Sequence, residues 1–123
     1  MKEIVLRVKN QNWGMIGPND LEEREWTIYS DLTVEYRETY NTYKDEEKYK
    51  ISNIVIEQAF YEKILKYIEM SKDNNTKIDA CDGDAWEFVQ LNNNSEIWKR
   101  ELDYIYGIQS LEEIARILFS LVK

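Results

Sequence analysis

Carboxylates are the chemical groups that this sequence concentrates most strongly, and they gather in one stretch. Residues 20–47 contain ten acidic and three basic residues, a net charge of −7, whereas the rest of the 123-residue chain carries −1. A solvated, soluble surface accounts for part of this charge. A concentration of one sign also steers and binds molecules of the opposite sign. The stretch is therefore the first candidate for a contact surface.

Aromatic side chains are interleaved with these acids, and such residues are typical of protein contact surfaces. We therefore predict that the stretch binds a basic partner protein, in the way that immunity proteins and inhibitors cap a cationic site. The predicted contact residues are Glu22, Glu23, Glu25, Trp26, Glu35, Tyr36, Glu38, Tyr40, Asp45 and Glu46.

The residue types that carry most enzyme chemistry are scarce. The chain has no histidine and one cysteine, which excludes serine triads and histidine-type zinc sites. Cys81 has acidic neighbours that oppose thiolate formation, so we interpret it as an inert thiol. The adjacent pairs Glu22-Glu23 and Glu112-Glu113 point in different directions and cannot converge on one substrate atom. The sequence predicts neither an enzyme nor a cofactor.

The segment 11–23 offers an alternative function, a binding site for a small molecule. It contains two of the four glycines and the only proline, without the spacing of a nucleotide loop. Connections this long are often functional. The residues that would contribute contacts are Trp13, Ile16, Asn19 and Asp20.

The segment 79–84 completes this alternative with three carboxylates, Asp79, Asp82 and Asp84. Their spacing is not that of a calcium loop. Asp82-Gly83 is typical of a two-residue hairpin turn, so we predict a structural turn and assign no metal ligand. Whether a divalent ion binds near Asp82 stays open.

Nucleic acid and membranes are the partners that the composition disfavours. Trp86, Phe88 and Trp98 alternate along two predicted strands, and an aromatic sheet face can stack bases. A net charge of −8 gives no basic surround for phosphates, so we predict that these rings form core. No stretch approaches the roughly 20 apolar residues that span a bilayer. Charges interrupt the first residues before a signal peptide could form, and we expect a cytoplasmic protein.

The spacing of apolar residues along the chain predicts the strands and helices that position these residues. The predicted fold class is α+β, in a single domain over residues 1–123 with the order β-β-β-β-α-β-β-β-α. We expect an antiparallel or mixed sheet of about five to seven strands with both helices packed on one face. The predicted strands are 1–10, 25–30, 33–43, 49–56, 77–81, 84–91 and 96–102, and the helices are 57–72 and the segment that follows Ser110.

Two details of this assignment bear on function. In strand 33–43, Glu35 and Arg37 share one face, and residues 31–32 form either a tight turn or a bulge before it. Ser110 and Glu113 have the spacing of a capping box at the start of the last helix. That helix has one apolar side, which Ile117 and Phe119 widen. A homodimer joined through this helix is therefore a third hypothesis.

Four segments together resemble small function-unknown proteins of Gram-positive bacteria. The resemblance covers most of the chain, implies a compact α+β domain and assigns no catalytic residue. The segments are Trp13-Gly14-Met15-Ile16-Gly17-Pro18, Trp26-Thr27-Ile28-Tyr29, Cys81-Asp82-Gly83-x-x-Trp86-Glu87-Phe88 and Tyr104-Ile105-Tyr106-Gly107-Ile108-x-x-Leu111-Glu112-x-Ile114.

Overall fold

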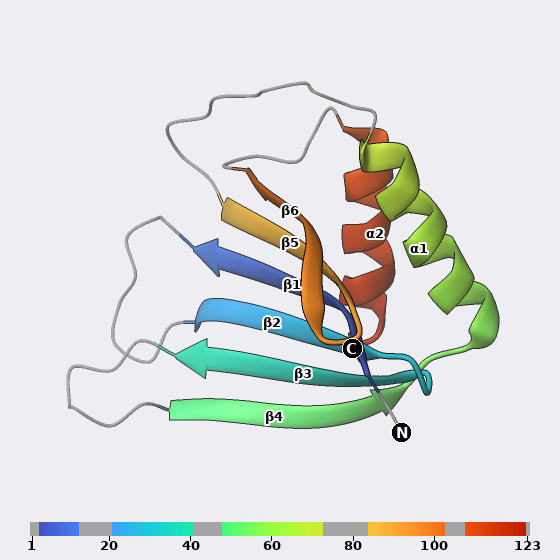
Figure 1. Ribbon diagram of the computed structural model, residues 1–123. Coiled ribbons are helices and arrows are strands. Elements are labelled where there is room, and N and C mark those ends of the chain that lie inside the picture. Colours follow the sequence, from blue (N-terminus) through green and yellow to red (C-terminus); the bar gives the residue numbers. More distant parts are fainter. Residues whose placement is uncertain (1–2, 13–20, 41–47, 73–83, 103–107, 123) are drawn as a thin grey trace.

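One antiparallel sheet with two helices makes up the part of the chain that the computed structural model describes, residues 3–12, 21–40, 48–72, 84–102 and 108–122 (Figure 1). This confirms the α+β class. The strand order is β4-β3-β2-β1-β5-β6. The elements are β1 (Ile4–Asn12), β2 (Leu21–Tyr29), β3 (Thr33–Tyr40), β4 (Lys48–Val55), α1 (Gln58–Lys72), β5 (Asp84–Asn92), β6 (Ser95–Leu102) and α2 (Gln109–Ser120).

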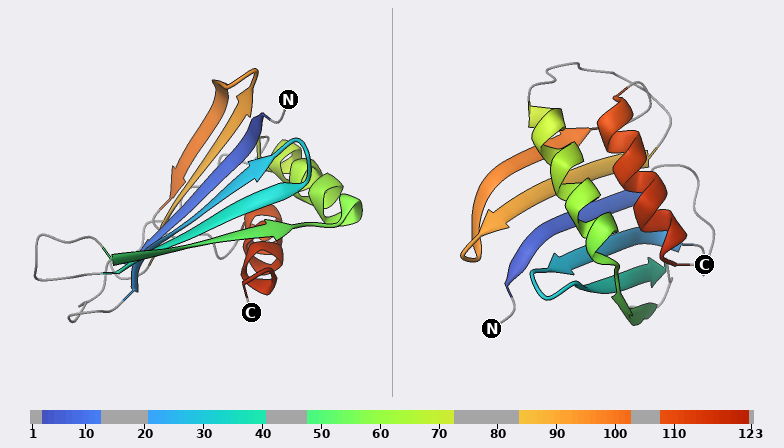
Figure 2. Two further views of the ribbon diagram at one scale, coloured as in Figure 1. Left: turned by 90° about the horizontal axis from the view of Figure 1, so that it is seen from below. Right: turned by 90° about the vertical axis from the view of Figure 1, so that its right-hand side faces the viewer.

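Both helices lie on the same side of the sheet, side by side (Figure 2). They cover one face of the strands and leave the other without a helix among the described residues. The seventh predicted strand, 77–81, and the Asp82-Gly83 turn lie outside the described residues.

Alternation of side chains along β1 shows why these segments form strands. Leu6 and Val8 are buried beneath the helices, whereas Arg7 and Lys9 point to the uncovered face. In β1 the buried side chains thus lie on one face and the charged ones on the other, which fixes the register of this strand in the sheet.

Two tight turns connect neighbouring strands. Leu32 has φ 70° and its N–H donates to the carbonyl of Tyr29 at 3.2 Å, which makes residues 31–32 a tight turn rather than a bulge within one strand. Asn93 and Asn94 both have positive φ, 53° and 62°, between β5 and β6. Consecutive positive φ values are typical of a two-residue hairpin, and asparagine adopts them more easily than most residues.

Aromatic rings form the centre of the core. The ring of Trp26 lies 5.2 Å from Tyr36, 5.3 Å from Phe119 and 6.4 Å from Trp86, measured between centroids. Trp86 also stacks with Phe88 at 5.9 Å. The helices complete the core with side chains spaced three and four residues apart, Ile64 and Ile68 of α1 and Leu111, Ile114, Ala115 and Leu118 of α2.

The predicted capping box at the start of α2 is wrong. The helix begins at Gln109, its N-cap is Ile108, and no side chain of the described part of the chain caps it. Ser110 is instead buried against α1, where its Oγ lies 2.6 Å from the Oγ of Ser71. Ser71 Oγ in turn donates to the carbonyl of Tyr67 at 2.7 Å. The Ser110 hydroxyl, which the local sequence pattern assigned to a helix cap, therefore forms a contact between the two helices instead.

This hydroxyl pair predicts an asymmetry between two alanine variants. Since Ser71 donates its one hydrogen to Tyr67, Ser110 must donate to Ser71. Ser71→Ala leaves the buried Ser110 hydroxyl without its acceptor and should reduce the free energy of unfolding by about 1–3 kcal/mol. Ser110→Ala leaves Ser71 bonded and should reduce it by about 0.5–1.5 kcal/mol. Urea denaturation of both variants and the double variant measures this; equal losses from the two single variants would refute the assignment.

Candidate functional site

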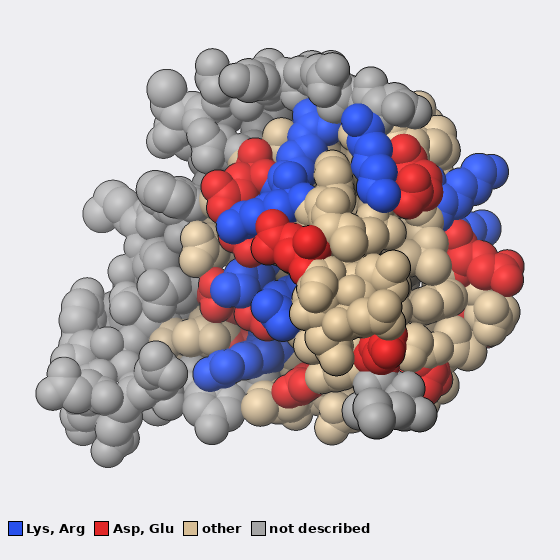
Figure 3. Space-filling model, in the orientation of Figure 1, with Lys and Arg blue, Asp and Glu red and all other residues tan. Residues whose placement is uncertain are grey.

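The face of the sheet opposite the helices is the candidate site, and we call it the open face. Acidic and basic side chains lie next to one another over part of it, beside an uncharged area (Figure 3). The register produces one row that crosses four strands with alternating sign, because Arg37 pairs with Glu25, Glu25 with Lys9, and Lys9 with Glu87.

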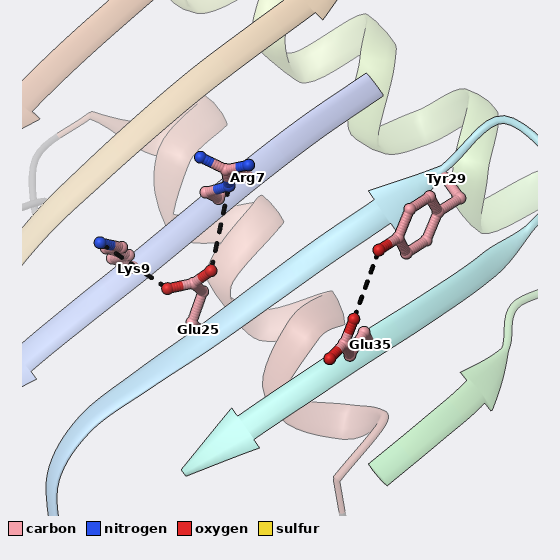
Figure 4. Close-up of polar contacts among 5 residues, drawn as sticks. All are labelled: Arg7, Lys9, Glu25, Tyr29 and Glu35. Carbon is pink, nitrogen blue, oxygen red and sulfur yellow. Dashed lines mark hydrogen bonds and ion pairs between the residues drawn. The ribbon is translucent and has the colours of Figure 1, made fainter. Parts of the chain in front are cut away.

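Glu25 lies near the middle of the open face between two cations of β1. Its Oε1 is 3.9 Å from Arg7 Nε and its Oε2 is 3.7 Å from Lys9 Nζ (Figure 4). Ion pairs of this exposure contribute little to stability, about 0–1 kcal/mol each. Their main effect is to neutralise the Glu25 carboxylate.

Glu35 on β3 has different surroundings. The hydroxyl of Tyr29 donates to its Oε2 at 3.3 Å (Figure 4), and among the described residues no cation lies within ion-pair distance of this carboxylate. Burial raises the pKa of the Tyr29 phenol, and the charge of Glu35 raises it further. Tyr29 therefore stays protonated and holds the Glu35 carboxylate in place without neutralising it.

A hollow of about 210 Å³ lies between these side chains on the open face. Both arginines and both carboxylates contribute to its wall, so it is polar and close to neutral. It is lined by Ile4, Arg7, Glu25, Thr27, Tyr29, Glu35 and Arg37.

Exposed aliphatic side chains border this region on β4. Asn53 pairs with Glu35, and on either side of it Ile51 pairs with Arg37 and Val55 with Thr33. Ile51 is 48% exposed and Val55 is 76% exposed. The register thus places two exposed aliphatic side chains diagonally across from Glu35, an arrangement that suits the long apolar stem and charged tip of a lysine or arginine.

The predicted contact residues do not share one surface. Glu23, Glu25 and Glu35 are together on the open face, whereas Glu38 and Tyr40 lie on the helix-facing side of β3, where the Tyr40 hydroxyl donates to Glu38 at 3.2 Å. The side chain of Glu22 and the residues Asp45, Glu46, Trp13, Ile16, Asn19, Asp20 and Asp82 lie outside the described part.

Two of the predicted contact residues are core residues, which corrects their assignment. Trp26 is 0% exposed and Tyr36 is 4% exposed, so neither ring can reach a partner in the folded protein. Their even spacing with Ile28 and Val34 places them on the helix-facing side, where they fill the space between sheet and helices.

Sequence reasoning also missed the cations that share the open face. Arg7 and Lys9 are far from the acidic stretch along the chain but adjacent to it in the sheet, because β1 pairs with β2. The open face is therefore of mixed charge rather than of one sign. The alternation of residues in β1 predicts that Arg7 and Lys9 point outward. It does not predict that β1 pairs with β2.

Within the described residues no group of three or more His, Cys, Asp or Glu side chains is arranged to hold a metal ion. None of the helices there is long and apolar enough to cross a membrane. No model of a known protein family matches the sequence, and a search of curated proteins finds no similar protein.

Proposed function

We propose that this protein is a binding module that holds a basic partner protein on the open face of its sheet, with Glu35 as the anchor. The observation that carries the proposal is the state of that carboxylate. It is oriented by Tyr29, has no ion pair among the described residues, and lies beside exposed aliphatic groups. A lysine or arginine of the partner would supply the missing cation.

The mixed charge of the open face favours a protein over a simple polycation. Arg7, Lys9 and Arg37 would repel an unpatterned positive chain but would pair with acidic groups placed between the partner's cations. The net charge of −8 supplies long-range steering toward a basic molecule, and the row of alternating sign supplies register. The partner class that fits is a basic protein with a cationic site. This protein would cover that site, as inhibitors and immunity proteins cover the sites of their targets.

A pair of charge reversals on β3 tests this proposal. Glu35 and Glu38 are on the same strand, three residues apart, but on opposite sides of the sheet. Glu35→Lys should weaken partner binding by about 2 kcal/mol, roughly thirtyfold in Kd, because it places a cation where the partner presents one. Glu38→Lys makes the same change of net charge on the other side and should leave Kd nearly unchanged.

The partner is first captured from a lysate of the source cells and identified by mass spectrometry, and Kd is then measured by calorimetry with the purified protein. Thermal unfolding of each variant checks that the fold is intact. Equal losses from the two reversals would mean that only net charge matters, and an unchanged Kd for Glu35→Lys would remove the open face as the contact surface.

A further inference from the structure

The outer edge of β4 differs from the other edge of the sheet. β4 and β6 are the two end strands, so each presents one row of backbone groups that no described strand pairs with. β6 carries charges along its length, including the ion pair between Lys99 and Glu101 at 3.2 Å. The last five residues of β4, Ile51–Val55, contain no charge. Such charges normally protect an edge against pairing with another strand, and this part of β4 has none.

The direction of the backbone groups in β4 follows from one hydrogen bond. The N–H of Ile56 donates to the carbonyl of Leu32 at 2.9 Å, toward β3. Because successive residues of a strand direct their N–H and C=O groups to opposite sides, the groups of Ile51, Asn53 and Val55 point away from β3. The same three residues place their side chains on the open face.

We propose that β4 pairs with β4 of a second copy of this chain, antiparallel, with a two-fold axis at Asn53. In this register Asn53 lies opposite Asn53, and Ile51 of each copy lies opposite Val55 of the other. Outward-directed residues then meet outward-directed residues, as an antiparallel ladder requires. The two pairs of aliphatic side chains, 48% and 76% exposed in one copy, then lie side by side on the open face and each loses part of its exposed surface.

A second copy is the occupant because this edge is self-complementary. The sequence around Asn53 is symmetrical in character, with an aliphatic residue two positions away on each side, and a two-fold interface needs such a surface.

Charge placed on each edge tests the pairing. Val55→Lys puts a cation opposite Ile51 of the second copy, and Ile97→Lys makes the same kind of change on β6, where Ile97 is 55% exposed. In sedimentation velocity over a wide range of concentration, the wild type should dimerise. Val55→Lys should raise the dimer dissociation constant at least about tenfold. Ile97→Lys should leave it unchanged, and all three proteins should melt at similar temperatures.

Cysteine cross-linking tests the register in a Cys81→Ser background. Asn53→Cys should give a disulfide-linked dimer under mild oxidation, because opposed residues of a ladder have Cα atoms about 5.5 Å apart, within disulfide range. Ile51→Cys should not cross-link, since residue 51 meets residue 55. A wild type that stays monomeric, a dimer that survives Val55→Lys, or cross-linking at 51 but not at 53 would each overturn the proposal. The test needs no partner protein, so it is independent of the proposed function.

Discussion

Replacing Trp26 with alanine should lower the free energy of unfolding by about 3–5 kcal/mol, a large part of the roughly 5–15 kcal/mol that stabilises most domains. The indole is fully buried and contacts rings from β3, β5 and α2. Alanine would leave a cavity that three elements border, and no one of them can move to fill it without disturbing the others. Chemical denaturation followed by circular dichroism measures the loss.

Trp26→Phe separates packing from hydrogen bonding at the same position. The indole Nε1 of Trp26 is buried and has no hydrogen-bond partner among the described residues. Phenylalanine removes this unsatisfied donor while keeping a ring in the cluster, so the loss should stay below about 1.5 kcal/mol. A loss as large as that of alanine would show that the indole has a hydrogen-bond partner in solution.

Ile114→Ala should produce the second large effect, a loss of about 2–5 kcal/mol in the free energy of unfolding. Ile114 is fully buried at the centre of α2 and belongs to the core cluster between the helices and the sheet. Ile117, one turn further along the same helix, is only partly buried. Ile117→Ala removes the same atoms and should lower the free energy of unfolding by less. The difference between the two losses measures the contribution of burial at Ile114. Equal losses would contradict the placement of α2 on the sheet.

Trp26 and Ile114 lie on the opposite side of the sheet from Glu35. The helix-facing side holds the aromatic cluster and the buried isoleucines, whereas the open face holds exposed ion pairs that contribute little to stability. Substitutions on the open face should therefore change binding without unfolding the protein. Residues of the proposed contact surface can therefore be exchanged while the core stays unchanged.

The elements themselves could be predicted from the sequence because their signals are local. Alternation at Leu6 and Val8, and the spacing of Ile64 and Ile68, record which side of each element meets the core. The face shared by Glu35 and Arg37 follows from the same rule and is confirmed by their register with β2. The tight turn at Leu32 was ambiguous, because a leucine with positive φ has no sequence signature.

Two predictions failed because a tertiary contact competes with a local pattern. Ser110 matches a capping residue, yet its hydroxyl bonds to Ser71, 39 residues away in the chain. Trp26 and Tyr36 match an exposed contact surface by residue type, yet the rings of Phe119 and Trp86 meet Trp26 in the core. Aromatic side chains suit both environments, so their type alone does not assign them.

By itself, the sequence determined the α+β class, most of the segments that form the described strands and helices, and the concentration of acids in residues 20–47, since each of these depends on neighbours along the chain. The predicted strand 25–30 in fact begins at Leu21, and the predicted strand 77–81 lies outside the described residues. Only the tertiary structure decided what surrounds each acid. The pairing of β1 with β2 places Arg7 and Lys9 against Glu25, and the pairing of β3 with β4 sets Glu35 among exposed aliphatic groups. The reason is physical: the charge on a surface depends on strand order and register, and these follow from packing the whole core.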